Sequence, residues 1–337
     1  MPRHYLTSRS FAALKLVLMA LAVWLLWLCS KESITGLLEV NFKTKVNRTV
    51  YSTDSEAQDL FARAEQRQKM RKKQLKDYCQ QHSYTRLPWD RKRMLDKFLI
   101  DDKNKFIYCT VPKVATTPFK MTLMRLRNDS GLKITGATAH NPKYWRHMSE
   151  YNEKELSPRL ETHFKFLFVR EPFHRLLSGY KDKFFGPLRF YTNGFRAMIV
   201  KAFRPQELQA ISTTTNDVTF TEFLEYIVSY SNAWSHNAHW RQVEHICFPC
   251  AFEFDLIGHF ETLEEDVAYF LKKAEFDDRV TFPPIPSSTT DGKFTEYYEQ
   301  VPRETIYRVA EAFRGDFEMF GYPFPGPLKS LLGDHAQ

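Results

Sequence analysis

The feature that most constrains the fold is a nearly continuous apolar run, FKFLFV, at residues 164–169. A strand with one exposed face alternates apolar and polar residues, so this run predicts a strand buried on both faces, as in a parallel sheet. Glu171 and Pro172 then predict the start of a helix, because proline is tolerated in a first helical turn. Residues 105–111 form a second run rich in β-formers, also followed by a turn and by helical spacing. Two strand–loop–helix units predict an α/β fold with a central parallel sheet flanked by helices.

The composition is that of a folded protein. Hydrophobic residues make up 43% of the 337 positions and charged residues 26%, which excludes a disordered, collagen-like or polytopic membrane protein. Lys and Arg outnumber Asp and Glu by 48 to 40, a formal charge of +8. That charge favours anionic partners: nucleic acid, phosphorylated cofactors or acidic polysaccharides. Amphipathic spacing predicts further helices over residues 219–230, 263–274 and 304–320.

Residues 11–28, FAALKLVLMALAVWLLWL, form an apolar run just long enough to cross a bilayer. Arg3, Arg9 and Lys15 precede or open the run, which predicts a cytosolic N-terminus and a lumenal bulk. A cleaved signal peptide is the alternative, but its apolar region is usually shorter and ends in a small-x-small site. We therefore expect one uncleaved signal anchor in a single-pass type II membrane protein. The expected divisions are a cytoplasmic tail (1–10), the anchor (11–29), a stem (30–95), a lumenal domain (96–325) and a C-terminal tail (326–337).

Two kinds of residue agree with a lumenal location. Asn47 and Asn128 begin N-x-[ST] glycosylation sequons. Outside the anchor the chain has an even number of cysteines, which could form two disulfides in three ways: Cys79, Cys109, Cys247 and Cys250. Cys247 and Cys250 could instead be half of a zinc site or a redox pair, but no second closely spaced pair completes a tetrahedral site. No metal is therefore expected.

Residues 62–76 of the stem combine good helix formers with seven basic residues and one acidic residue. Their apolar face is small, so we expect a solvated helix with, at most, some attraction to polyanionic glycans. A nucleic-acid arm is the alternative interpretation. A lumenal protein meets no nucleic acid, so we expect no nucleic-acid partner.

Two loops carry residues suited to binding anions. In the first, VPKVATT at 111–117, a helix N-terminus would offer unpaired N–H groups, with Lys113 as a cation and Thr116 and Thr117 as hydroxyl donors. In the second, Arg170 follows the buried strand, at the sheet edge where open α/β folds bind ligands. Arg170 and Ser178 could hold a second phosphate. Alternatively, Arg170 forms a structural ion pair with Glu171 or Asp182.

Together, VPKVATTPFK (111–120) and VREPFHRLLSGY (169–180) resemble the 5′- and 3′-phosphate sites of sulfotransferases that use 3′-phosphoadenosine-5′-phosphosulfate (PAPS). More narrowly, the chain resembles the Golgi carbohydrate sulfotransferases of the HNK-1 and chondroitin/dermatan 4-O-sulfotransferase family. Three later blocks agree with that family's pattern: NAHWR with CFPC (237–250), DLIGHFETL (255–263) and DFEMFGY (316–322). The resemblance covers about residues 75–325 and implies a P-loop-like sulfotransferase fold on the Golgi membrane.

The resemblance implies that PAPS is the sulfate donor and that no metal takes part. Residues of both loops would bind it: Pro112, Lys113, Val114, Ala115, Thr116, Thr117 and Pro118, with Arg170, Glu171, Pro172, Phe173, His174, Arg175, Leu176, Leu177 and Ser178. The first loop departs from the family pattern, because Thr116, Pro118 and Phe119 replace a Cys, an Asn and a Trp. Lys113, Thr117 and Lys120 are retained, so we expect donor binding to survive and acceptor preference to differ.

The implied reaction is in-line transfer of a sulfuryl group to a sugar hydroxyl, with Lys113 acting on the leaving oxygen. His140 and His239 are the candidates for the general base, and either could be a structural histidine instead. The expected partner is a glycosaminoglycan or glycoprotein glycan, with position 4 of N-acetylgalactosamine in chondroitin or dermatan as the target. The alternatives are 3-O-sulfation of terminal glucuronic acid, an inactive glycan-binding protein, and a glycosyltransferase. A glycosyltransferase would normally carry an Asp-x-Asp motif, and this sequence has none. The sequence leaves open whether the chain forms a homo-oligomer.

Overall fold

The computed structural model describes residues 54–82, 95–127, 131–185, 193–206, 218–229, 237–285 and 291–332. The predicted anchor (11–29) and both glycosylation sequons lie outside these ranges. Within them, no helix combines the length and the apolar character needed to cross a membrane. Contacts divide the chain after Leu60, and the residues from Phe61 onward form the compact unit that is described below.

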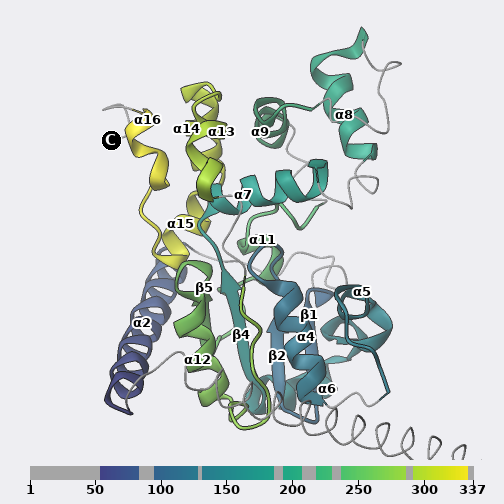
Figure 1. The fold of residues 1–337 in the computed structure, drawn as a ribbon, viewed down its shortest axis with the longest axis vertical. Helices are drawn as coiled ribbons and strands as arrows, with labels where there is room; N and C mark the ends of the chain where they lie inside the picture. The colour runs from purple at the N-terminus through teal and green to yellow at the C-terminus, as the bar shows by residue number, and fades with distance from the viewer. Residues whose placement is uncertain are drawn as a thin grey trace, which may run out of the picture. The chain divides into compact units, whose positions relative to one another are not determined.

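A five-stranded sheet lies at the centre of this unit (Figure 1). Its strands are β1 (Phe98–Asp101), β2 (Phe106–Cys109), β3 (Arg146–His147), β4 (Phe164–Val169) and β5 (Leu256–His259). Their order is β3-β1-β2-β4-β5. Strands β2, β4 and β5 run parallel, whereas β1 pairs antiparallel with both β2 and β3. The prediction of an α/β fold is confirmed, but that of a parallel sheet is wrong for one half, because β1 and β2 are joined by a short hairpin that permits only antiparallel pairing.

One face of the sheet is covered by α4 (Thr116–Arg127) and α12 (Leu263–Lys273). Alternate residues of β4 point to this face, where Phe168 packs against Phe119 of α4 with ring centroids 4.2 Å apart. Phe166 packs against Phe270 of α12 at 4.3 Å. The unbroken apolar run in β4 is thus explained, because both faces of the strand are covered: its last four residues are all buried.

A second apolar cluster lies among helices that follow β4 along the chain. These helices are α7 (Pro172–Tyr180), η3 (Lys181–Phe185), α8 (Asn193–Phe203), α9 (Phe220–Ser229), α13 (Phe294–Tyr298), α14 (Arg303–Ala312), α15 (Arg314–Phe320) and α16 (Lys329–Leu332). Trp240 is 1% exposed within the cluster, so it is a core residue and not a surface for stacking sugars. The helix predicted over 304–320 is two helices that meet at Phe313.

The remaining elements are short, apart from α2 and α6. They are α2 (Asp54–Gln81), α5 (Gly136–His140), η1 (Pro142–Tyr144), η2 (Met148–Glu150), α6 (Glu153–Thr162), α11 (Glu244–Cys247), η6 (Phe260–Thr262), η7 (Asp291–Lys293) and η8 (Gly326–Leu328).

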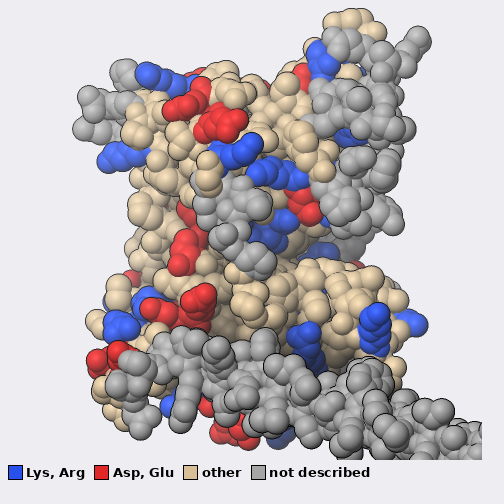
Figure 2. Space-filling model, viewed as in Figure 1, with Lys and Arg blue, Asp and Glu red and all other residues tan. Residues whose placement is uncertain are grey.

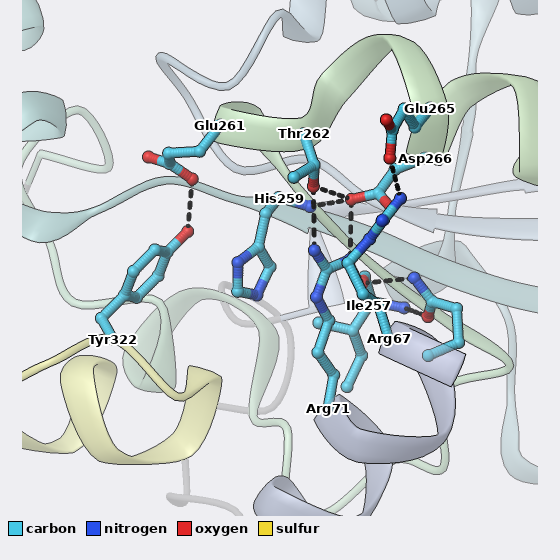
Figure 3. A network of polar contacts seen from close by, with 10 residues as sticks. Arg67, Arg71, Ile257, His259, Glu261, Thr262, Glu265, Asp266 and Tyr322 are labelled. Carbon is cyan, nitrogen blue, oxygen red and sulfur yellow. Dashed lines mark hydrogen bonds and ion pairs between the residues drawn. The ribbon is translucent and has the colours of Figure 1, made fainter. Parts of the chain in front are cut away.

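Helix α2 contains the basic segment of the stem and packs against the edge of the sheet. The side-chain amide of Gln68 donates to the Ile257 carbonyl and accepts from the Ile257 N–H, both at 2.9 Å, so it satisfies backbone groups of edge strand β5. Arg71 donates to the carboxylate of Asp266 at 2.6 Å (Figure 3). The expectation of a fully solvated helix is therefore wrong for this face, because its polar side chains find buried partners.

Two disulfides join Cys79 to Cys250 and Cys109 to Cys247. This pairing is one of the three that the sequence allowed. It excludes a zinc half-site or a redox pair at Cys247 and Cys250, since each is bonded to a distant cysteine. The first disulfide holds the end of α2 to the segment before β5, and the second holds that segment to the end of β2.

Candidate active site

The first loop turns sharply between β2 and α4. Lys113 and Ala115 have φ angles of 74° and 65°, in the left-handed region that residues with a Cβ rarely occupy. Such strained backbone is typical of functional loops. Where left-handed and right-handed backbone conformations alternate along a loop, successive N–H groups point toward one position. The Thr116 hydroxyl donates to the Val111 carbonyl, so it closes the loop and does not point outward as we expected. Pro118 lies in the first turn of α4, where its missing N–H removes no helical hydrogen bond.

Lys113 faces a carboxylate. Its Nζ lies 3.1 Å from Oδ2 of Asp182, and Nζ of Lys183 lies 3.4 Å from the same oxygen. Burial lowers the pKa of Lys113, against the opposing effect of Asp182. Burial would raise the pKa of Asp182, but Lys113 and Lys183 together hold it below its ordinary value. Lys113 is thus held at the bend of the loop by its ion pair with Asp182.

The two histidines proposed as bases lie near this ion pair. Nε2 of His140 is 2.7 Å from Oγ1 of Thr117. Nδ1 of His239 is 2.8 Å from Oδ1 of Asn237, which also accepts from the His239 N–H at 2.9 Å. Because that oxygen is an acceptor, Nδ1 carries the proton and Nε2 is left as the acceptor.

Both histidines are uncharged near neutral pH. Burial lowers the pKa of His140, with smaller effects in the same direction from Lys120 and Lys183. Burial also lowers the pKa of His239, to about 3, and Lys183 and Lys113 contribute to this shift. The negative charge of Asp182 acts in the opposite direction and raises the pKa of both histidines, so both lie within the electrostatic influence of this carboxylate.

In the second loop, Arg170 is 5% exposed and its guanidinium lies 4.1 Å from the centre of the Phe260 ring. It borders a cavity of about 460 Å³ lined also by His174, Glu261 and Tyr322. Glu171 caps α7, since its Oε2 accepts from the backbone N–H of His174 at 2.8 Å. Arg170 also makes a small contribution to lowering the pKa of Lys113, after burial and Lys183.

Arg175 is placed differently from the prediction. It is 1% exposed, and it donates to the carbonyls of Pro112 at 3.2 Å and Ala238 at 2.9 Å. Its Nη1 lies 4.0 Å from Oδ2 of Asp316. Arg175 therefore ties the first loop to the segment that carries His239, and its guanidinium is turned into the protein.

The structure thus brings together part of the predicted set. Lys113, His140 and His239 all lie close enough to Asp182 for its charge to affect their pKa values, and Thr117 contacts His140. Arg170 lies at a separate cavity lined by residues of the second loop and of the later segments. Ser178 is half-buried on α7, two turns beyond the start of the helix. The other predicted positions are buried in the protein or support the loops: Val114, Pro172, Phe173, Leu176 and Leu177.

From the sequence, Asp182 is only a possible ion-pair partner of Arg170, and sequence reasoning missed its place beside Lys113. It follows Ser178 by four positions, so helical spacing places both on one face and could have indicated it. Lys and Arg side chains gather around the hollow at mid-height of the face in Figure 2, with acidic side chains among them. In the described part of the chain, no group of three or more His, Cys, Asp or Glu is arranged to hold a metal ion.

Residues 96–323 match the model of the Sulfotransferase family. The chain belongs to the sulfotransferase family. Its relatives include carbohydrate sulfotransferase 11 of Rattus norvegicus, 34% identical over 278 residues and 77% of each chain. Carbohydrate sulfotransferase 14 of Danio rerio is 33% identical over 77% of this chain and 72% of its own. Carbohydrate sulfotransferase 10 of Homo sapiens is 33% identical over 69% of each.

No solved structure matches the chain. The resemblance drawn from the two loops and the later blocks is confirmed, and family membership supports carbohydrate sulfotransferase activity. Sulfotransferases of this family generally take sulfate from PAPS.

Proposed function

We propose that this protein transfers the sulfuryl group of PAPS to position 4 of N-acetylgalactosamine in chondroitin or dermatan. The observation that carries the proposal is the arrangement of Lys113 and Thr117 at the N-terminus of α4, with His140 2.7 Å from Thr117. A cation, a set of helix N–H groups and an uncharged imidazole are the groups that such a transfer requires.

The donor supplies an activated sulfuryl group whose leaving group is adenosine 3′,5′-bisphosphate. Lys113 binds the 5′-phosphate and the bridging oxygen, where negative charge develops. Backbone N–H groups of residues 114–117 support it, and the left-handed turns at Lys113 and Ala115 fit an anion at this position. Arg170 and Ser178 bind the 3′-phosphate, Arg170 from the wall of its cavity.

His140 removes the proton from the acceptor hydroxyl. A base is most effective when its pKa is near the working pH, and His239, with a pKa near 3, holds a proton poorly. Part of the His140 residue is exposed, so an acceptor can reach it although its ring is partly shielded from water, whereas Asn237 holds His239 through Nδ1. His239 is therefore assigned to orienting the acceptor and not to proton transfer.

The acceptor assignment rests on the likeness of the NAHWR block to that of 4-O-sulfotransferases. Location in the Golgi membrane, with residues 96–325 in the lumen and residues 11–29 as the anchor, belongs to the same proposal. Glycosylation at Asn47 and Asn128 would follow from that topology.

The proposal is tested with the full-length protein in detergent and radiolabelled PAPS. Chondroitin, desulfated dermatan and a glycan ending in glucuronic acid are offered side by side. We expect label on position 4 of N-acetylgalactosamine. Lys113→Ala should lower kcat by about 100-fold or more, because it removes charge stabilisation at the leaving oxygen. Arg170→Ala should raise the donor KM by roughly 10- to 100-fold.

The matched control is Lys154→Ala, an exposed lysine on α6, which should retain full activity. Full activity of the Lys113→Ala enzyme would contradict the assigned chemistry. Label on terminal glucuronic acid would replace the acceptor with the 3-O alternative. Binding of a sulfated glycan without any transfer from the donor would identify a glycan-binding protein.

A further inference from the structure

We propose that Lys97, Lys120 and Arg241 form an anion subsite that binds the carboxylate of a uronic acid next to the sugar that is sulfated. The inference rests on the proposed transfer reaction and specifies which acceptors the site accepts: glycans that carry a negative charge beside the reacting hydroxyl.

The three residues come from distant segments that the fold brings to the carboxyl end of β2. The carbonyl of Lys97 accepts from the N–H and the hydroxyl of Thr110, at 2.8 and 2.9 Å, which places Lys97 beside the residue that follows β2. Lys120 is on α4, three residues after Thr117, and so shares a helix face with the residue that contacts His140.

Arg241 reaches the same region through the segment that carries His239. Its N–H donates to the Asn237 carbonyl at 3.0 Å, in the turn that also holds His239. The Cys109–Cys247 disulfide fastens the continuation of this segment to the last residue of β2. The subsite is therefore built on a strand end, a helix and a disulfide-held turn, all of which are fixed elements.

In the described part of the chain no ion pair joins these three residues to a carboxylate, although Asp96 acts on Lys97 from farther away. All three are half-buried, and within the described ranges none lies within ion-pair distance of an acidic side chain. Lys113 differs, since it pairs with Asp182. Partly buried cations without a counter-charge are costly, so this arrangement favours an anionic ligand.

Electrostatic effects link the cations to one another and to the proposed base. Burial lowers the pKa of Lys97, Arg241 lowers it further, and Asp96 opposes the change. Burial lowers the pKa of Lys120 to about 8, with a further contribution from Lys97. Lys120 in turn lowers the pKa of His140, after burial. The charge of the subsite thus reaches His140, whose pKa is also affected by Asp182 and Lys183.

The position of the subsite beside His140 indicates that its ligand belongs to the acceptor and not to the donor. The donor's phosphates are assigned to Lys113 and Arg170, and His140 is the group that meets the acceptor hydroxyl. A carboxylate bound by Lys97, Lys120 and Arg241 would therefore belong to the sugar adjoining the reacting one. Arg and Lys bind carboxylates through charge-assisted hydrogen bonds. A neutral glycan with the same N-acetylgalactosamine lacks this contact.

The test compares chondroitin with chondroitin whose uronic acids have been reduced to neutral sugars, using the full-length protein. For the unmodified protein we expect the acceptor KM to rise by about 10- to 100-fold on reduction, with kcat and the donor KM changing little. Lys97→Gln, Lys120→Gln and Arg241→Gln should raise the KM for chondroitin and abolish the preference over the reduced form. Lys154→Gln is the matched control and should preserve the preference.

Equilibrium binding of the two oligosaccharides, in the presence of adenosine 3′,5′-bisphosphate, gives a readout that needs no turnover. Equal affinity for both would overturn the subsite even if no sulfate is transferred. Recovery of affinity by a reduced chondroitin that carries 6-O-sulfate would also overturn it, because the ligand would then be a sulfate ester. Loss of transfer with the binding preference intact would instead count against the proposed reaction. Unfolding midpoints near that of the unmodified protein show that the variants are folded.

Discussion

At the residue scale, Asp182 is the carboxylate around which the cations of the site gather. It lies 3.1 Å from Lys113 and 3.4 Å from Lys183, in the turn that continues α7. It holds the ammonium group of Lys113 in one place while also presenting a negative charge where an anionic donor is proposed to bind. These two effects act in opposite directions on catalysis and on donor affinity.

Asp182→Asn should therefore separate the two effects. We expect kcat to fall by about tenfold or more, because Lys113 loses the partner that orients it. The affinity for adenosine 3′,5′-bisphosphate should rise by about 3- to 10-fold, because repulsion between like charges is removed. Initial rates and calorimetric titration measure the two quantities. Asp278→Asn, an exposed aspartate, is the control. Weaker binding together with unchanged kcat would contradict this account.

Arg175 shows the limit of reasoning from a motif. Its place in the second loop predicted phosphate binding, yet its guanidinium donates hydrogen bonds to the carbonyls of Pro112 and Ala238. Sequence spacing fixes the helix face of a residue but not which distant carbonyls that face meets. The position of Lys113 could be predicted from the bend of one loop, because that geometry is local.

Arg175→Met should lower the free energy of unfolding by about 3–5 kcal/mol, since it leaves the buried Asp316 without its cation. Arg175→Lys should recover only part of this loss, because one ammonium group cannot reach both carbonyls. Urea unfolding followed by tryptophan fluorescence, with the disulfides intact, measures the change. A change below 1 kcal/mol for the Met variant would show that the contacts contribute little.

At the scale of elements, helix α2 completes the sheet. Strand β5 ends the strand order, and without the Gln68 amide the outward N–H of Ile257 would lose its acceptor. Arg71 and Asp266 add a buried ion pair at the same edge, and Thr262 bonds to both of them (Figure 3). The helix itself could be predicted from its residues, but its docking could not, because its apolar face is small.

Gln68→Met should destabilise the protein by roughly 1–3 kcal/mol, because the N–H of Ile257 is left buried without an acceptor. Lys72→Met, an exposed position on the same helix, should change the free energy of unfolding by less than about 0.5 kcal/mol. Urea denaturation of both variants makes the comparison. Equal effects would mean that the edge contact contributes nothing beyond helix propensity.

At the scale of the whole unit, the site lies where the two apolar clusters meet. The first loop extends from the sheet cluster, whereas α7 and Trp240, next to His239, belong to the helical cluster. The α/β class could be predicted from the run at 164–169, because a strand that is buried on both faces has an almost unbroken apolar sequence. The antiparallel half of the sheet could not, since β1 is only four residues long and its FLID sequence does not show which strand it pairs with.

The docking of α2 also sets where the chain can be cut. A protease that cleaved between residues 30 and 53 would leave a unit that keeps Gln68, Arg71 and both disulfides, and therefore a complete sheet and site. Cleavage within residues 83–94 would sever α2 from the following chain, yet Cys79 would still hold it to Cys250. In an oxidising compartment such a nicked enzyme would stay whole, and a reducing agent would then let α2 leave and expose the edge of β5. Cleavage before α2 therefore leaves the unit intact, whereas cleavage after α2 leaves the Cys79–Cys250 disulfide as the covalent link that retains this helix.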